Sequence, residues 1–116
     1  MTRGRHTLTE IESQPEAWAE TLAQLRHTPG LDDFAPERFD EVLFIGCGST
    51  YYLAVAAATL YQQLNEVPAR GLPASELWLR PEAYLSPRRR ALLVAVSRSG
   101  NTTETVRAVA AFRKHT

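Results

Sequence analysis

The chain has 116 residues, of which 44% are hydrophobic, an amount that suits one modest core. Thirteen Lys and Arg residues balance thirteen Asp and Glu residues, so the net charge is zero. No overall basic field is therefore expected to attract nucleic acid or an anionic membrane. An anionic ligand would have to be held by local groups.

The single cysteine, Cys47, cannot form an internal disulfide, and no Cys/His spacing matches a zinc site. The expected compartment is the reducing cytoplasm. The basic segment at residues 1–6 is not followed by an apolar stretch, so we expect neither a signal peptide nor a membrane-spanning helix.

The first part of the chain is predicted to hold a leader and one helix. Residues 1–12 are expected to form the leader, and residues 13–16 combine an N-cap candidate, an early proline and an acid at the capping-box position. Trp18, Leu22 and Leu25 then recur at spacings of four and three, which predicts an amphipathic helix covering the core.

Three strands follow. Residues 41–46 and 91–96 are continuously apolar runs, typical of strands covered on both faces of a parallel sheet, and residues 67–72 are a weaker edge candidate because they contain proline and glycine. A short helix is expected over residues 75–79, stopped by proline. The helix after the first strand is predicted to bury Leu53, Ala56, Ala57, Leu60, Tyr61 and Leu64.

A final helix is predicted to start at residues 101–103 and to bury Val106, Val109, Ala110 and Phe112. The alternation of strands and helices predicts an α/β fold with a doubly wound parallel sheet and right-handed crossovers. With the edge strand on one side of the first strand and the third strand on the other, the order is 2-1-3.

Both strongly apolar strands run into a loop rich in Gly, Ser and Thr that opens a helix. Helix N-termini present unpaired N–H groups and a positive dipole end, so such loops suit phosphate. In the order 2-1-3 the two loops meet at a switch point, where doubly wound sheets bind ligands. The candidate binding residues are Cys47, Gly48, Ser49, Thr50, Ser97, Arg98, Ser99, Gly100, Asn101 and Thr102.

Three other interpretations of these loops are possible. Helix capping and tight turns alone would favour the same residue types, and a generic domain without ligand would follow. A dinucleotide site fits poorly, because Tyr51 replaces the third glycine of the G-x-G-x-x-G pattern and Glu66 precedes the second strand instead of ending it. A Walker loop is missing its Gly-Lys-Ser/Thr.

Four segments in order resemble the sugar isomerase (SIS) domain family, most closely the isomerase half of glutamine–fructose-6-phosphate aminotransferases. They are residues 9–15 with Thr21-Leu22, residues 46–51, residues 74–76 and residues 97–102. The resemblance implies a flavodoxin-like strand order and a sheet of about five strands. We therefore expect residues 13–116 to be the N-terminal, incomplete part of such a domain.

The resemblance implies that Ser97, Ser99 and Thr102 hold the phosphate of a sugar 6-phosphate, of the fructose 6-phosphate or glucosamine 6-phosphate class, with Ser49 and Thr50 adding contacts. It implies no metal or organic cofactor, and a homodimer for a full-length protein. The acid/base carboxylate, the ring-opening histidine and the Schiff-base lysine of the family come later in the chain, so the segment alone is expected to bind weakly and catalyse nothing.

Two positions depart from the aminotransferase pattern. Arg98 stands where that family has glutamine, and Asn101 stands where it has glutamate. The loop is more similar to those of sugar-phosphate deaminases, deglycases and amino-sugar isomerases, which we therefore expect the parent protein to resemble in activity. The alternative is a non-catalytic, sugar-phosphate-sensing domain of a transcriptional regulator, although no basic helix-turn-helix precedes the domain here.

Overall fold

A computed structural model describes residues 3–116 of the chain. The chain divides into two compact units, residues 1–33 and residues 34–116. The first unit contains α1 (Arg5–His27), and the second contains the sheet and the remaining helices. Of two 3-10 turns, Leu31–Phe34 spans the boundary between the two units and Pro36–Arg38 follows it in the second unit.

The second unit is built on a parallel sheet of three strands in the order β2-β1-β3. The strands are β1 (Glu41–Gly46), β2 (Ala69–Pro73) and β3 (Ala91–Ala95). Every residue of β1 is buried, as its unbroken apolar run predicts for a central strand. The predicted fold class and the order 2-1-3 are therefore confirmed.

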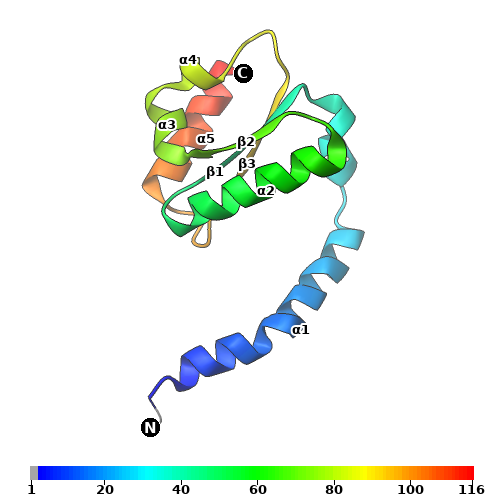
Figure 1. The fold of residues 1–116 in the computed structure, drawn as a ribbon, viewed down its shortest axis with the longest axis vertical. Helices are drawn as coiled ribbons and strands as arrows, with labels where there is room; N and C mark the ends of the chain where they lie inside the picture. The colour runs from blue at the N-terminus through cyan, green and yellow to red at the C-terminus, as the bar shows by residue number, and fades with distance from the viewer. Residues whose placement is uncertain (1–2) are drawn as a thin grey trace. The chain divides into compact units, whose positions relative to one another are not determined.

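Helices cover both faces of this sheet. One face packs on α2 (Ser49–Asn65), and the other on α3 (Ala74–Leu79) and α5 (Thr103–His115), as Figure 1 shows. Alternate residues of β1 point to the two sides: Val42 and Phe44 belong to the α2 side, whereas Leu43 and Ile45 belong to the α3 and α5 side. The fold is thus doubly wound, and the sheet separates the hydrophobic core into two clusters, one on each face.

The buried face of α2 differs from the predicted one. Ala54 and Ala58 are the buried residues of this helix, whereas Leu53, Leu60 and Leu64 are more than half exposed. The small alanine side chains let the helix approach the sheet closely, and the leucines are turned outward as a result. Of the predicted face, Ala57 and Tyr61 are partly buried and pack against the core, whereas Ala56 is exposed.

Two glycines fix that close approach. A Cβ on Gly71 of β2 would lie 2.6 Å from Val55 Cα, and a Cβ on Gly46 at the end of β1 would lie 2.4 Å from the main-chain carbonyl of Thr50. Both contacts are to backbone atoms of α2, which cannot move aside as a flexible side chain can. Any larger residue at either position would therefore push α2 away from the sheet.

The last helices also correct the sequence analysis in part. Pro81 begins a further short helix, α4 (Pro81–Tyr84), instead of simply ending the helical segment, because proline suits the first position of a helix. In α5 the buried residues are Thr105 and Ala108, while Val106 is half exposed and Ala110 is exposed. The buried face of α5 is thus turned by about one residue from the predicted face.

In the first unit, α1 begins at Arg5, within the segment expected to be a leader, and Pro15 lies inside the helix instead of near its start. The stripe of Trp18, Leu22 and Leu25 is formed as expected from its spacing. Within this unit, no described residue of α1 is buried.

Replacing Gly71 by alanine should lower the free energy of unfolding by about 1 to 3 kcal/mol, the usual cost of overpacking a tight contact. The measurement is urea unfolding followed by circular dichroism. Trimming the side chain opposite, in a Gly71→Ala/Val55→Ala double variant, should not restore stability, because the nearest atoms are backbone. Ala56→Ser on the exposed side of α2 is the matched control. A Gly71→Ala variant as stable as the control would contradict the close approach.

Candidate functional site

The two predicted loops lie side by side at the carboxyl ends of β1 and β3. The strands pair in parallel, with Ile45 opposite Ala95. The pairing continues one step into the second loop, where the Val96 N–H donates to the Ile45 carbonyl at 2.8 Å. The loops therefore meet at the edge of the sheet where doubly wound folds bind ligands.

The first loop is held in shape by a hydroxyl. Thr50 Oγ1 accepts a hydrogen bond from the Cys47 N–H at 2.8 Å and donates one to the Cys47 carbonyl at 2.8 Å. Gly48 has a φ of 57°, a left-handed conformation that favours glycine, and it immediately precedes the first residue of α2. The Thr50 hydroxyl thus donates its single proton within the loop itself, and Thr50 also lines the pocket described below.

In the second loop the hydroxyls act as acceptors. Ser97 Oγ accepts from the Gly100 N–H at 2.9 Å, and Ser99 Oγ accepts from the Asn101 N–H at 3.1 Å. A serine hydroxyl that accepts a bond still has its own proton to donate. Ser97 and Ser99 therefore hold the loop in shape as acceptors, and each hydroxyl keeps a proton that it can donate.

The helices that follow both loops begin without a side-chain cap. Neither Gly48 ahead of α2 nor Thr102 ahead of α5 makes a capping side-chain hydrogen bond. The first N–H groups of such helices have no intrahelical partner and carry the positive end of the helix dipole. Each helix therefore carries a partial positive charge at the loop that precedes it, although the Thr50 and Tyr51 N–H groups of α2 donate to the Cys47 and Gly48 carbonyls at 3.2 and 3.1 Å.

The structure brings seven of the ten predicted residues together around one pocket of about 330 Å³. Of the other three, Gly48 and Gly100 contribute backbone conformation, with φ values of 57° and 72°, and the Asn101 N–H is bonded to Ser99. The pocket is lined by Cys47, Ser49, Thr50, Ser97, Arg98, Ser99 and Thr102.

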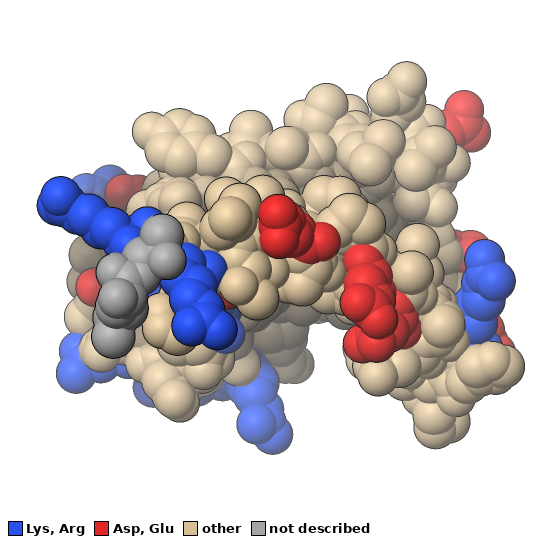
Figure 2. Space-filling view, turned by 90° about the horizontal axis from the view of Figure 1, so that it is seen from below, with Lys and Arg blue, Asp and Glu red and all other residues tan. Residues whose placement is uncertain are grey.

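Arg98 is the only charged residue in that lining, and its side chain is exposed. On the face shown in Figure 2, Lys and Arg as well as Asp and Glu residues are exposed. This distribution agrees with the zero net charge of the chain. Attraction of an anion to the pocket would thus come from Arg98 and from the two helix ends, at short range.

Sequence reasoning missed the residues on the other side of Cys47. There a second pocket, of about 350 Å³, contains Glu104, whose Oε2 lies 4.0 Å from Cys47 Sγ. Thr105 Oγ1 lies 3.7 Å from the same sulfur. Glu104 is an acidic residue in the first turn of α5, and nothing in the sequence links it to Cys47. The rest of that lining is Gly46, Gly48, Tyr51, Tyr52, Pro73 and Ser75.

Among residues 3–116, no group of three or more His, Cys, Asp and Glu side chains is placed to hold a metal ion. Within the same residues, no helix is both long and apolar enough to cross a membrane.

A doubly wound domain with two glycine- and hydroxyl-rich loops at its switch point belongs to the class of α/β proteins that bind ligands at strand ends. The sequence model of the SIS domain matches residues 38–115, and the chain belongs to this family.

Curated relatives include two glutamine–fructose-6-phosphate aminotransferases. The protein from Chlamydia caviae is 30% identical over 115 residues, which cover 94% of this chain and 18% of the relative. The protein from Caulobacter vibrioides is 35% identical over 107 residues, covering 86% of this chain and 17% of the relative. The chain thus spans less than a fifth of the length of these relatives.

Two solved structures have similar folds. Tagatose-6-phosphate ketose/aldose isomerase from Escherichia coli superposes with a TM-score of 0.79 at 25% identity, covering 92% of this chain and 30% of that one. Glucosamine-6-phosphate deaminase from Thermotoga maritima has a TM-score of 0.59 at 34% identity, covering 66% of this chain and 23% of that one. The predicted resemblance to sugar-phosphate isomerases and deaminases is therefore confirmed.

The role of Thr50 can be tested by two substitutions that differ in one hydroxyl. Thr50→Val leaves the Cys47 N–H without its partner and should lower the free energy of unfolding by about 1 to 3 kcal/mol. Thr50→Ser keeps the hydroxyl and should lose much less. Thermal unfolding measures both, and a Thr50→Val variant as stable as Thr50→Ser would show that the hydroxyl does not hold the loop.

Proposed function

We propose that this chain is the part of a sugar-phosphate enzyme that holds the phosphate. The observation that carries the proposal is the single pocket between two uncapped helix N-termini, lined by Ser49, Ser97, Ser99 and Thr102 with Arg98 at its edge. Serine and threonine hydroxyls, main-chain N–H groups and one guanidinium are all donors. Such a set suits a phosphate dianion, which has only acceptors to offer.

The proposed ligand is a sugar 6-phosphate of the fructose 6-phosphate or glucosamine 6-phosphate class. The names of the relatives and of the similar structures specify fructose 6-phosphate, glucosamine 6-phosphate and tagatose 6-phosphate. All three are phosphorylated at position 6 and differ at other carbons. A pocket that reads mainly the phosphate would serve all of them, and other parts of a longer protein would distinguish the sugars.

In this proposal the role of the two loops is to position the sugar phosphate. Binding energy from a non-reacting phosphate holds the carbons that react against groups located elsewhere in a full-length protein. Those groups would move a proton between C1 and C2 of the opened sugar, coupled to loss or gain of nitrogen. Ser97 and Ser99 would donate to phosphate oxygens, and Thr50 would keep the first loop in the shape that presents Ser49 to the ligand.

The second loop favours a deaminase or deglycase over a glutamine-dependent synthase. Arg98 places a full positive charge where the aminotransferase pattern has a neutral glutamine, and Asn101 removes the negative charge of a glutamate. Both changes make the loop more attractive to an anion. The Thermotoga maritima deaminase is among the similar structures, at 34% identity.

We also propose that a full-length protein is a homodimer. Large apolar side chains on α2, those of Leu53, Leu60 and Leu64, are more than half exposed in this chain. Their spacings of seven and four place them on one side of the helix, where a second helix could cover them.

The phosphate assignment can be tested by calorimetry with glucosamine 6-phosphate and fructose 6-phosphate. Ser97→Ala and Ser99→Ala each remove one donor, and we expect each to weaken binding by about tenfold, with the double variant losing detectable binding. Ser86→Ala, in the segment ahead of β3, is the matched control and should bind as the parent does.

Unphosphorylated fructose should not bind to any of these proteins, because the proposed contacts are to phosphate. The proposal fails if the double variant binds glucosamine 6-phosphate as tightly as the Ser86→Ala control. It also fails if fructose binds as tightly as its phosphate ester, since the pocket would then recognise the sugar and not the phosphate.

A further inference from the structure

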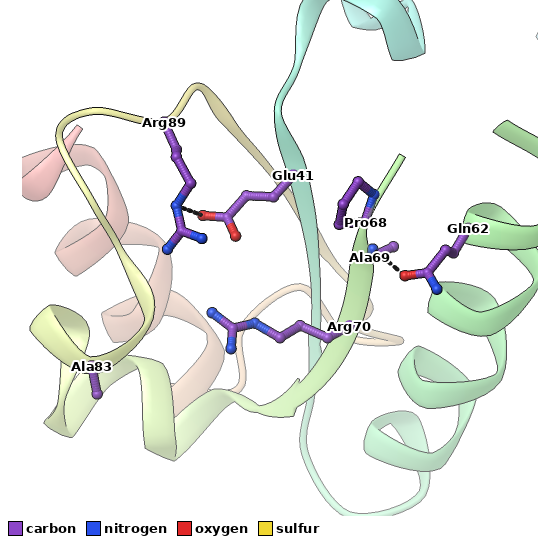
Figure 3. Close-up of a pocket in the computed structure, with 7 residues that line it drawn as sticks. All are labelled: Glu41, Gln62, Pro68, Ala69, Arg70, Ala83 and Arg89. Atoms are coloured by element: carbon purple, nitrogen blue, oxygen red, sulfur yellow. Dashed lines mark hydrogen bonds and ion pairs between the residues drawn. The ribbon is translucent and has the colours of Figure 1, made fainter. Parts of the chain in front are cut away.

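A third pocket, of about 360 Å³, opens at the amino end of the sheet, where β1 and β2 begin. It lies at the far end of the strands from the two loops. Glu41 starts β1 and Gly46 ends it, so the two ends are roughly 16 Å apart at the usual rise of a strand. Figure 3 shows its seven lining residues, which are Glu41, Gln62, Pro68, Ala69, Arg70, Ala83 and Arg89.

At the centre of this pocket is a buried carboxylate. The side chain of Glu41 is only 9% exposed, and its Oε1 atom is buried without a hydrogen-bond partner in the described structure. Arg89 Nε lies 3.5 Å from that oxygen, which makes an ion pair but not a well-formed hydrogen bond. A buried charged oxygen that lacks a hydrogen bond is costly, so a donor from a ligand would stabilise it.

Arg70 reaches into the same pocket from β2 and is held in place there. One terminal nitrogen, Nη2, donates to the Tyr84 carbonyl at 3.2 Å, and the guanidinium lies 5.2 Å from the centre of the Tyr84 ring. These contacts fix the plane of the group. A guanidinium has five N–H donors. One of those of Arg70 bonds to the Tyr84 carbonyl, so the others are available to an anion.

Arg89 supplies the second positive charge, and its neighbours do not compete for the site. Its side chain is half exposed, and Figure 3 shows its guanidinium and that of Arg70 facing the Glu41 carboxylate. Arg90 is engaged elsewhere: its N–H donates to Asp40 at 2.7 Å and its Nη2 lies 3.4 Å from the same carboxylate. The hydrogen bond from the Arg90 N–H, together with the Arg90 guanidinium, lowers the pKa of Asp40.

The pocket therefore holds two positive charges and one negative charge, and it has an excess of donors. We propose that it binds a small organic oxyanion that carries a hydroxyl or ammonium group beside the anionic group. The oxyanion would bridge Arg70 and Arg89, and the neighbouring O–H or N–H would donate to Glu41 Oε1. A metal ion does not fit, because two guanidinium groups share the pocket with the single carboxylate.

A phosphate ester and a hydroxy or amino carboxylate share this chemistry, and the experiment separates them. The chain is titrated by calorimetry with glycerol 3-phosphate and with lactate, and with inorganic phosphate as the probe that lacks a carbon-bound hydroxyl. All titrations are carried out in the Ser97→Ala/Ser99→Ala background. Binding at the loops is thereby removed, so this test stands or falls independently of the proposed function.

We expect glycerol 3-phosphate, lactate or both to bind, and the tighter of the two identifies the anionic group. Arg89→Ala should weaken that binding by about tenfold, as the loss of one charge-assisted contact does. Arg88→Ala, which removes the neighbouring arginine outside the pocket, is the matched control and should change nothing. Glu41→Gln should tighten the binding of inorganic phosphate, because it removes the negative charge from the pocket.

Arg70→Ala should weaken binding in the same way, and circular dichroism shows whether that variant folds. If it does not fold, the half-exposed Arg89 still carries the test. A second readout is NMR of the Ser97→Ala/Ser99→Ala variant with the pocket residues unchanged. In its spectra, the amide signals of Arg70 and Ala83 should shift as the probe is added. The proposal is overturned if no probe binds, or if Arg89→Ala binds the probes as tightly as Arg88→Ala does.

Discussion

The close packing of α2 on the sheet is the constraint on which the rest of the domain depends. It is possible only because Gly46 and Gly71 have no side chain, and because α2 presents alanines to β1 and β2. The contact at Gly46 lies within the first turn of the helix, next to Thr50. It therefore sets where the N-terminus of α2 lies and, with it, the position of the first loop.

This constraint explains how a chain without net charge could hold a dianion. The proposed phosphate pocket uses one guanidinium, and most of its donors are hydroxyls and main-chain N–H groups of two helix ends. Such dipolar donors act only over short distances, so they need a rigid frame. The pairing of β1 with β3 and the glycine contacts of α2 provide that frame.

The two strands β1 and β3 could be predicted from the sequence because apolar runs lead directly into loops with clear turn residues, whereas β2, which contains arginine, glycine and proline, gave a weaker signal. The buried face of α2 could not be predicted, because this helix contains both leucines and alanines at helical spacing. Sequence periodicity alone favours the leucines, whereas the glycine at position 71 of a different element decides for the alanines. The contact between Gly71 and the backbone of α2 at Val55, two residues far apart in the sequence, therefore determines which face of α2 is buried.

The same distinction holds for the candidate site. The loops were predictable because Gly, Ser and Thr directly follow two strands. The use of the Thr50 hydroxyl inside its own loop was not, since a threonine at a helix start suits both capping and ligand binding. Glu104 and the cluster of Glu41, Arg70 and Arg89 depend on residues far apart in the sequence, which only the folded chain brings together.

The central claim is that a phosphate binds between the N-termini of α2 and α5. The most direct measurement is a map of amide chemical shifts while the chain is titrated with glucosamine 6-phosphate. If the phosphate binds there, the largest shifts should fall on the first-turn amides of both helices, at Ser49 and at Thr103 and Glu104, and on the loop at Ser97 to Gly100. Shifts confined to one helix end, or centred on residues outside the two loops, would contradict it.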